Sequence, residues 1–311
     1  MDTVSDRDTM GREGCETEHE QETRHQGDRN RKRKLEDEMD IKSKNACVDD
    51  EVVLEYLDGE NDGIAVLCLN RKNARNALSC KLVEDVQSAL AEVGQEQEGV
   101  RCLILRSLVP GVFCAGADLK ERTKMSEENV SAYLKRLKDL VAALEELQIP
   151  VVAAVEGAAL GGGLEVILGC DMRVGTTSSI FGLPETRLGV IPGAGGTVRL
   201  GRVVGWGRAR QMILTGGRIG GSQAEQWGLL NVCVEDGAAY GKALEMARDV
   251  VEGAPLAVRM AKVALRAAER LEQEEGLEVE QACYETLLPS WDRMEGLRAW
   301  GQRRKQHFRG K

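Results

Sequence analysis

From residue 52 onward, apolar positions follow two alternating periods, which predicts strands interleaved with helices. Short apolar runs typical of strands cover 52–57, 63–69, 100–106 and 149–155. The first two runs flank an Asp-Gly-Glu-Asn-Asp segment, which favours a hairpin. Strands that alternate with helices indicate an α/β layer structure.

Helical spacing is clearest in one run of apolar residues, Leu82, Val83, Val86, Leu90 and Val93. Ser126 is the expected N-cap of a second, longer helix that continues to Leu147, with Glu128 in its first turn. From Gly237 the chain reads as almost wholly helical. The pattern therefore predicts a helical C-terminal region after the α/β layers.

Composition changes sharply near residue 50. Residues 1–50 hold 10 Lys and Arg, 15 Asp and Glu, and no aromatic residue, so they cannot bury enough apolar surface to fold. The basic run at 29–34 resembles a nuclear-import signal, but acidic residues at 36–38 follow it, and a solvated charged tail is the simpler interpretation. We expect a disordered tail (1–50), an α/β core (51–240) and a helical C-terminal region (241–311).

Charge and cysteine content exclude several classes of protein. The net charge of −9 argues against attachment to nucleic acid or to an anionic membrane by charge alone. There is no run of 18 apolar residues, so no membrane span is expected. The nine cysteines form no CxxC pair and there are only three histidines, which predicts reduced thiols and no metal site.

Candidate chemistry lies in three glycine-rich segments that follow or precede predicted strands and helices: 109–120, 159–165 and 181–197. None has the order of a nucleotide phosphate loop. One glycine turn alone is compatible with close helix–strand packing, and one carboxylate with a salt bridge. Two such turns can each supply a free N–H group to an oxyanion hole, and Glu165 with Glu185 can divide the acid and base roles.

These segments resemble the enoyl-CoA hydratase/isomerase (crotonase) superfamily, and within it the methylglutaconyl-CoA hydratase branch. The resemblance rests on Phe-Cys-Ala-Gly-Ala-Asp-Leu-Lys-Glu-Arg at 113–122, Ala-Leu-Gly-Gly-Gly-Leu-Glu at 159–165, Ala-Cys-Tyr at 282–284 and Asp-Arg-Met-Glu-Gly at 292–296. It extends from about residue 52 to the C-terminus. It implies a crotonase (ClpP-like) superhelix of ββα units whose helical C-terminal region forms trimers, or dimers of trimers.

The resemblance also implies a reaction and a site. The reaction is syn addition of water to a 2-enoyl-CoA, either 3-methylglutaconyl-CoA or a short- or medium-chain substrate, in amino-acid or fatty-acid breakdown. The N–H groups of Ala117 and Gly162 would form the oxyanion hole, Glu165 would act as base, and Glu185 would protonate Cα as the other half of a coupled pair. No cofactor is implied, because coenzyme A is part of the substrate.

Contacts to coenzyme A follow from the same resemblance. The loop at 115–120 would lie along pantetheine and adenine, Arg75 would meet the phosphates, and Lys305 and Phe308 would act on a neighbouring subunit. The full set is Arg75, Ala77, Ala115, Asp118, Leu119, Lys120, Lys305 and Phe308. The family suggests a mitochondrial location, although the acidic N-terminus does not resemble a transit peptide and a cytosolic location stays open.

Two functions other than hydration remain as alternatives. An isomerase of the same fold commonly needs one carboxylate, whereas both hydratase glutamates are present here. A member of the branch can bind AU-rich RNA through lysines on the helix at 81–92, but here that helix carries Glu84, Asp85 and Glu92, which would repel phosphate.

Overall fold

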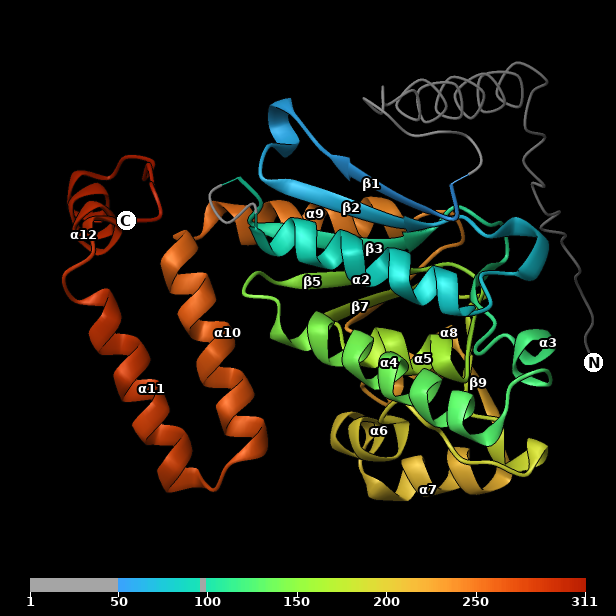
Figure 1. Ribbon diagram of the computed structural model, residues 1–311. Helices are drawn as coiled ribbons and strands as arrows, with labels where there is room; N and C mark the ends of the chain where they lie inside the picture. The colour runs from blue at the N-terminus through green and yellow to red at the C-terminus, as the bar shows by residue number, and fades with distance from the viewer. Residues whose placement is uncertain (1–49, 96–98) are drawn as a thin grey trace, which may run out of the picture. The chain divides into compact units, whose positions relative to one another are not determined.

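The alternating strands of the sequence form two sheets in the computed structural model, which describes residues 50–95 and 99–311 (Figure 1). All but the last residue of the predicted 1–50 tail lies outside the described residues. Within these ranges, the larger sheet contains, in spatial order, β1 (Val52–Tyr56), β2 (Ile64–Leu69), β3 (Cys102–Ser107), β5 (Val151–Val155), β7 (Met172–Thr176) and β10 (Val232–Val234). The pair β1–β2 is the predicted antiparallel hairpin, and the other neighbours are parallel.

The smaller sheet was not predicted, because its strands are only three residues long and carry no readable alternation. It contains β4 (Val112–Cys114), β6 (Ala158–Leu160), β8 (Ile180–Gly182) and β9 (Arg218–Gly220) in that order. Three of its strands are parallel, and β9 runs antiparallel to β8. This sheet matters for the site, because the loops after β4, β6 and β8 carry the three glycine-rich segments.

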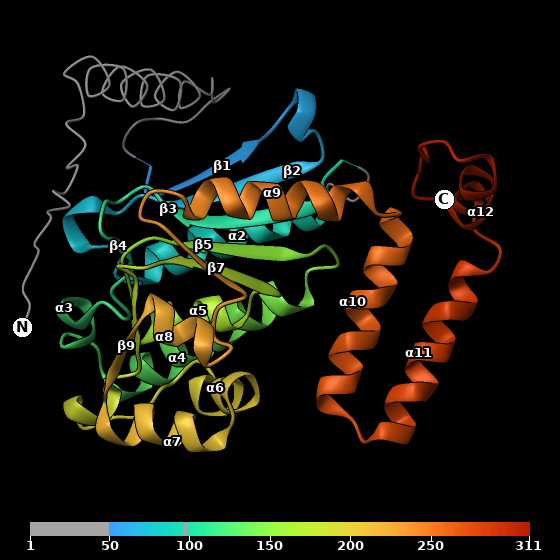
Figure 2. The ribbon, with the colours of Figure 1, turned by 180° about the vertical axis from the view of Figure 1, so that it is seen from behind.

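Helices cover both faces of the larger sheet. The helices α2 (Cys80–Gln95) and α4 (Glu127–Glu146) lie on one face, and α9 (Ala239–Glu252) lies on the other (Figure 2). All five apolar residues that predicted α2 are buried in the core. The Ser126 hydroxyl accepts a hydrogen bond from the Asn129 N–H at 3.3 Å, which confirms the predicted cap of α4.

Short helices connect the strands around the loops. They are η1 (Gly59–Asn61), η2 (Lys72–Ala74), α3 (Leu119–Arg122), α5 (Gly162–Leu168), η3 (Glu185–Leu188), α6 (Gly196–Val204), α7 (Trp206–Thr215) and α8 (Gly221–Gln226). Two of them, α5 and α6, begin in glycine turns as the sequence predicted.

The C-terminal region consists of α10 (Pro255–Arg270), α11 (Gln273–Leu287) and α12 (Trp291–Gln302). Both views show α10 and α11 side by side as a helical hairpin. The expected boundary at 240/241 falls inside α9, whose Ala243 and Ala247 pack with the strands because small side chains let the helix approach the sheet. The helices that extend from the core therefore begin at α10.

Candidate active site

The loop that follows β4 presents the N–H group of Ala117. It is held on both sides, because the Leu78 N–H donates to Gly116 O at 2.8 Å and the Asp118 N–H donates to Leu78 O at 3.1 Å. Gly116 has a φ of +97°, and a Cβ atom there would lie 2.9 Å from Leu160 O, so only glycine fits. Among the described residues, no acceptor binds the Ala117 N–H. This donor is therefore available to a ligand.

The N-terminus of α5 supplies the second donor. The first N–H groups of a helix have no intrahelical acceptor, and Gly162 is the first residue of α5. A Cβ atom on Gly162 would lie 3.7 Å from the Ala117 nitrogen, and one on Gly116 would lie 3.4 Å from the Gly162 nitrogen. The structure thus brings together the two N–H groups that the sequence analysis assigned to an oxyanion hole.

Glu165 lies one turn further along α5, where only 2% of the residue is exposed. Its Oε1 accepts hydrogen bonds from the N–H groups of Ala194 and Gly196, each at 2.8 Å. Burial raises the pKa of Glu165, and these two hydrogen bonds oppose the rise because they stabilise the carboxylate. The two hydrogen bonds hold the carboxylate in one orientation.

Glu185 begins η3 and reaches the start of α5, where a Cβ atom on Gly161 would lie 2.9 Å from its Oε1. Burial, aided by the negative charge of Glu165, raises the pKa of Glu185 to about 7, while the Arg122 charge acts in the opposite direction. Its Oε2 is buried and has no hydrogen-bond partner among the described residues. One carboxyl thus keeps a proton near neutral pH, and two backbone donors favour ionisation of the other, which is the pattern of an acid–base pair.

A polar hollow of about 760 Å³ lies beside the oxyanion loop and collects most of the residues predicted to bind coenzyme A. It is lined by Glu51, Asn70, Arg71, Lys72, Asn73, Ala74, Arg75, Ala77, Asp118, Leu119 and Lys120. Arg75 is exposed there, and its carbonyl accepts a hydrogen bond from the Ala115 N–H at 3.1 Å. Cationic groups and an exposed Leu119 suit a ligand with phosphates and an apolar arm.

Asp118, which was predicted to contact coenzyme A, lines the hollow, and its carboxylate also makes internal contacts. Its Oδ2 accepts from Arg71 Nη1 at 2.7 Å, and its Oδ1 accepts from the N–H groups of Lys120 and Glu121 at the start of α3. Burial would raise the pKa of Asp118, but these hydrogen bonds hold it below its usual value. The side chain fixes the loop.

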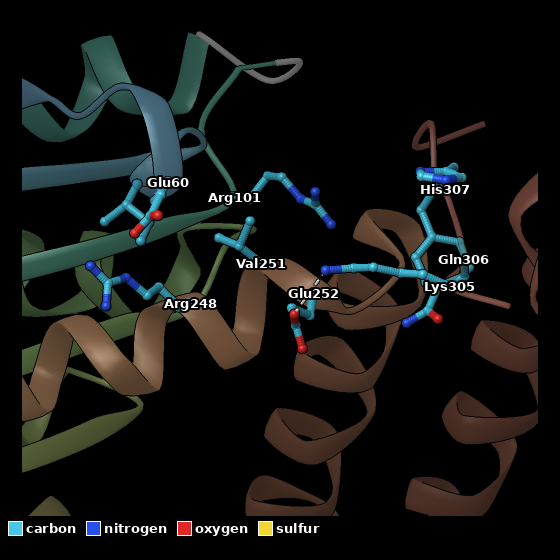
Figure 3. A pocket seen from close by; sticks show the side chains of 10 residues that line it. Glu60, Arg101, Arg248, Val251, Glu252, Lys305, Gln306 and His307 are labelled. Carbon is cyan, nitrogen blue, oxygen red and sulfur yellow. Dashed lines mark hydrogen bonds and ion pairs between the residues drawn. The ribbon is translucent and has the colours of Figure 1, made fainter.

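Lys305 and Phe308 lie away from this site within the chain. They line a different hollow of about 500 Å³ with Arg101, which precedes β3, and Glu252 at the end of α9. Figure 3 shows Lys305 extended toward Glu252, and their charged atoms are 3.2 Å apart. The active-site loops follow the C-terminal ends of strands, whereas this hollow borders the N-terminal end of β3. The role of these two residues at the site of a neighbouring subunit stays a prediction.

Sequence reasoning missed Arg71 and Asn76. Arg71 binds Asp118, Glu51 and the Ala77 carbonyl, so it joins the two walls of the polar hollow. Asn76 is fully buried at φ +52°, and its amide donates to Ser107 Oγ and Phe113 O. The only sequence signal was polar density in Asn-Arg-Lys-Asn-Ala-Arg-Asn at 70–76, which does not distinguish a structural residue from a surface one.

Other chemistries find less support in the described part of the chain. There, no group of three or more His, Cys, Asp or Glu side chains is placed to hold a metal ion. The cysteines of residues 50–95 and 99–311 are free, and burial raises the pKa of the Cys114 thiol, which adjoins the oxyanion loop, to about 12. Within the same residues, no helix has the length and hydropathy needed to cross a bilayer.

Comparison with known proteins decides the family. The model of the family described as enoyl-CoA hydratase/isomerase matches residues 59–311. The chain belongs to the enoyl-CoA hydratase/isomerase family. It is 46% identical over 259 residues to a probable mitochondrial enoyl-CoA hydratase 2 of Arabidopsis thaliana, covering 83% of this chain and 86% of that one. It is 40% identical over 266 residues to human mitochondrial methylglutaconyl-CoA hydratase, covering 84% and 78% of the two chains.

A solved structure supports the same assignment. The crystal structure of an enoyl-CoA hydratase from Bacillus anthracis aligns with a TM-score of 0.81 and 38% identity, covering 84% of this chain and all of that one. The expected crotonase fold and lyase family are thereby confirmed. The roles of individual residues stay predictions.

Proposed function

We propose that the chain is an enoyl-CoA hydratase that adds water across the double bond of a 2-enoyl-CoA. The observation that carries the proposal is the pair Glu165 and Glu185, held in different environments beside two free backbone N–H groups. One buried carboxylate is fixed by two donors, and the other carboxyl has a pKa of about 7. A hydration needs both a base for water and an acid for carbon, which this pair can supply.

The geometry of the site supports the following proposed steps. The thioester carbonyl accepts hydrogen bonds from the N–H groups of Ala117 and Gly162, which stabilise the enolate charge. Glu165 removes a proton from water as its oxygen bonds to Cβ, and the π electrons move toward the thioester. Glu185 then gives its proton to Cα. One proton passes from Glu165 to Glu185 before the next turnover, and no cofactor is required.

The substrate is a 2-enoyl-CoA with either a short or medium straight chain or the 3-methylglutaconyl group. The relatives include one named as a probable enoyl-CoA hydratase and one named as methylglutaconyl-CoA hydratase, which supports both choices. Both relatives are named as mitochondrial, so we propose a mitochondrial role in fatty-acid or branched-chain amino-acid breakdown, with the cytosol as the alternative. Hydration rates of crotonyl-CoA and 3-methylglutaconyl-CoA, measured side by side, decide the acyl group.

The helices α10–α12 are the proposed trimer interface. They expose large apolar side chains, including Leu265, Leu277, Leu297 and Trp300, the last with 84% of its surface accessible. Patches of this kind mark interaction surfaces. Light scattering of the purified chain should give a trimer or hexamer, and a monomer at micromolar concentration would contradict the proposal. In such an assembly Lys305 and Phe308 could approach the site of a neighbour.

The decisive experiment removes each carboxylate. Glu165→Gln and Glu185→Gln should each lower kcat by about 10²–10⁴-fold, because each deletes a positioned proton donor or acceptor. The double variant should lose far less than the product of the two single losses, since neither carboxylate completes the addition alone. Glu128→Gln, an exposed change on α4, is the matched control. Full hydration activity in Glu165→Gln would contradict the mechanism.

The same variants test the alternatives. An isomerase would convert a 3-enoyl-CoA and tolerate one of the two substitutions almost fully. RNA binding through α2 finds little support, since Lys81 is paired with Asp85 and the exposed face also carries Glu84 and Glu92. Tight, salt-sensitive binding of an AU-rich RNA by the purified chain, without hydration activity, would favour that function instead.

A further inference from the structure

The turn at 193–196 positions Glu165, the proposed base, but its own residues do not fix its backbone conformation. Its residues are Gly-Ala-Gly-Gly, and Gly195 adopts a φ of +103°. Both N–H groups that bind Glu165 Oε1 come from this turn, at Ala194 and Gly196. Glycine-rich backbone has many accessible conformations, so a side chain from elsewhere must fix the turn if Glu165 is to keep one position.

Arg199 supplies that side chain. Its Nη1 donates to Ala194 O at 2.9 Å, so Ala194 is held through its carbonyl by Arg199 and through its N–H by Glu165. The guanidinium lies directly against Gly195, where a Cβ atom would be 1.9 Å from Nη1. Any side chain at 195 would displace the arginine, which gives a second reason for glycine at that position.

The Arg199 guanidinium also binds Glu145, which lies at the end of α4. Nε donates to Oε1 at 2.6 Å and Nη2 donates to Oε2 at 2.9 Å, a bidentate pair in which each side chain is 19% exposed. Burial works to raise the pKa of Glu145, but Arg199, together with the charges of Arg270 and Arg266, holds it below its usual value. The pair therefore stays charged across the neutral range.

A third cation extends the chain of contacts into the C-terminal helices. Arg270, in the last turn of α10, donates to Glu145 Oε2 at 2.8 Å. The contacts thus run from Arg270 to Glu145, then to Arg199, to the Ala194 backbone and to Glu165. Among the described residues, Glu185 from η3 also faces Glu165, whose charge helps to raise the pKa of Glu185.

We propose that Arg199, clamped by Glu145, is a positioning residue that fixes the 193–196 turn and thereby the Glu165 carboxylate, and that Arg270 joins α10 to this clamp. The inference rests on the proposed function, in which Glu165 activates water. Misplacement of a reacting group by about 1 Å can cost on the order of 10²-fold in rate. The clamp acts through Glu165 without touching the substrate.

Arg199→Gln in the full-length protein is the first test, and Arg202→Gln is its control, because Arg202 is an exposed arginine on the same helix. We expect Arg199→Gln to lower kcat by about 10–100-fold with KM within about threefold of wild type. The acidic limb of kcat/KM should move to higher pH, because the turn's N–H groups and the Arg199 charge both lower the pKa of Glu165. Arg202→Gln should match wild type in all three measurements.

Two further measurements separate positioning from general stability. Adding Arg199→Gln to Glu165→Gln should cause no further loss of kcat, since the clamp has no other route to the reaction. Glu145→Gln keeps the size of the side chain but removes its charge, and should lose about 3–10-fold in kcat with the same direction of pH shift. If Arg199→Gln does not fold, as judged by circular dichroism, Glu145→Gln decides the question.

The outcomes are distinguishable from failure of the proposed function. If wild type does not hydrate enoyl-CoA, or if Glu165→Gln keeps full activity, the proposed function fails and this inference with it. If wild type is active, Glu165→Gln is inactive, and Arg199→Gln or Glu145→Gln behaves like Arg202→Gln in kcat and pH profile, the positioning role alone is overturned. A further large loss in the double variant would also overturn it.

Discussion

Arg71 Nη1 donates to Asp118 Oδ2 at 2.7 Å, and this bond joins the turn before α2 to the N-terminus of α3. The same guanidinium binds Glu51 at 3.0 Å and the Ala77 carbonyl at 2.8 Å. The two walls of the polar hollow are therefore held in one geometry by Arg71, whose side chain is 21% exposed.

Arg71→Gln should loosen this geometry. We expect KM for the enoyl-CoA substrate to rise about tenfold and kcat to fall less, since the hollow binds the ground and transition states alike. The loss of charge-assisted hydrogen bonds should also lower the free energy of unfolding by ~1–3 kcal/mol. Steady-state kinetics and thermal melting measure both effects, and Lys138→Gln, an exposed change on α4 outside the hollow, is the control.

Arg75→Ala tests the predicted phosphate contact. The side chain is exposed at the rim of the hollow and makes no structural contact comparable to that of Arg71. We expect KM to rise several-fold, kcat to change little, and the effect to shrink at high salt because screening weakens exposed charge pairs. Arg210→Ala, on the exposed side of α7, serves as control. An unchanged KM at low salt would remove Arg75 from the site.

Much of this fold could be predicted because its long elements have strong apolar periods. The five buried positions of α2, the Ser126 cap and the β1–β2 hairpin follow from local patterns that tertiary contacts reinforce. The smaller sheet could not be predicted, because strands of three residues carry no period. The smaller sheet forms because the elements that flank β4, β6, β8 and β9 bring the backbones of these four strands side by side.

The features of the site that depend on residue type could be predicted from the sequence. The contacts that depend on three-dimensional geometry could not. Two glutamates and two glycine turns are visible in the sequence, and a resemblance to a family relates them. The bonds from Arg71 to Asp118, and from Arg199 to Ala194, connect residues by side-chain reach across different elements. Asp118 illustrates the difference, since the sequence shows its carboxylate but not the Arg71 guanidinium and the two backbone N–H groups that it binds.

The pH dependence of kcat/KM should report the two carboxyl groups. Glu185 must be protonated to act as acid, so activity should fall as pH rises through about 7, the pKa to which burial raises it. Arg122→Gln should move this limb to higher pH by about 0.3–1 unit, because the Arg122 charge lowers the pKa of Glu185. Lys124→Gln, exposed just beyond α3, is the control. A limb that moves to lower pH would contradict the assignment.

Lys262 should be important for the attachment of α10. Only 6% of its side chain is exposed, and its ammonium donates to Asp171 Oδ2 at 2.7 Å and to Ile149 O at 2.9 Å. Lys262→Met removes two charge-assisted hydrogen bonds and leaves the more exposed Asp171 carboxylate without this partner, which should cost about 1.5–3 kcal/mol of unfolding free energy. Lys242→Met, which breaks a more exposed pair on α9, should cost less than about 1 kcal/mol. Denaturant titration compares them.

Glu185, the proposed acid, should lower the free energy of unfolding of the protein at neutral and alkaline pH. A carboxyl whose folded pKa is about 7, against an ordinary value of 4.5, is favoured as the neutral form in the folded state. The contribution of Glu185 to the free energy of unfolding is fully present below about pH 4.5 and is lost as pH rises through about 7. The reason is that the carboxyl ionises at a lower pH in the unfolded chain than in the folded one. Glu185→Gln has no charge to bury, so it should unfold at a higher temperature than wild type at pH 8.

Solvent screening limits the stability that Glu185→Gln should gain. Glu185 is partly exposed, so we expect about 1–2 kcal/mol at pH 8, less than the full pKa shift would give. The pH-dependent difference between Glu185→Gln and wild type should vanish well below pH 4.5, where the Glu185 carboxyl is neutral in both the folded and the unfolded chain. Glu128→Gln on α4 should show no such pH-dependent gain. Equal melting temperatures of Glu185→Gln and wild type at pH 8 would mean that the buried carboxyl is not destabilising, and would remove the physical basis for its role as the acid.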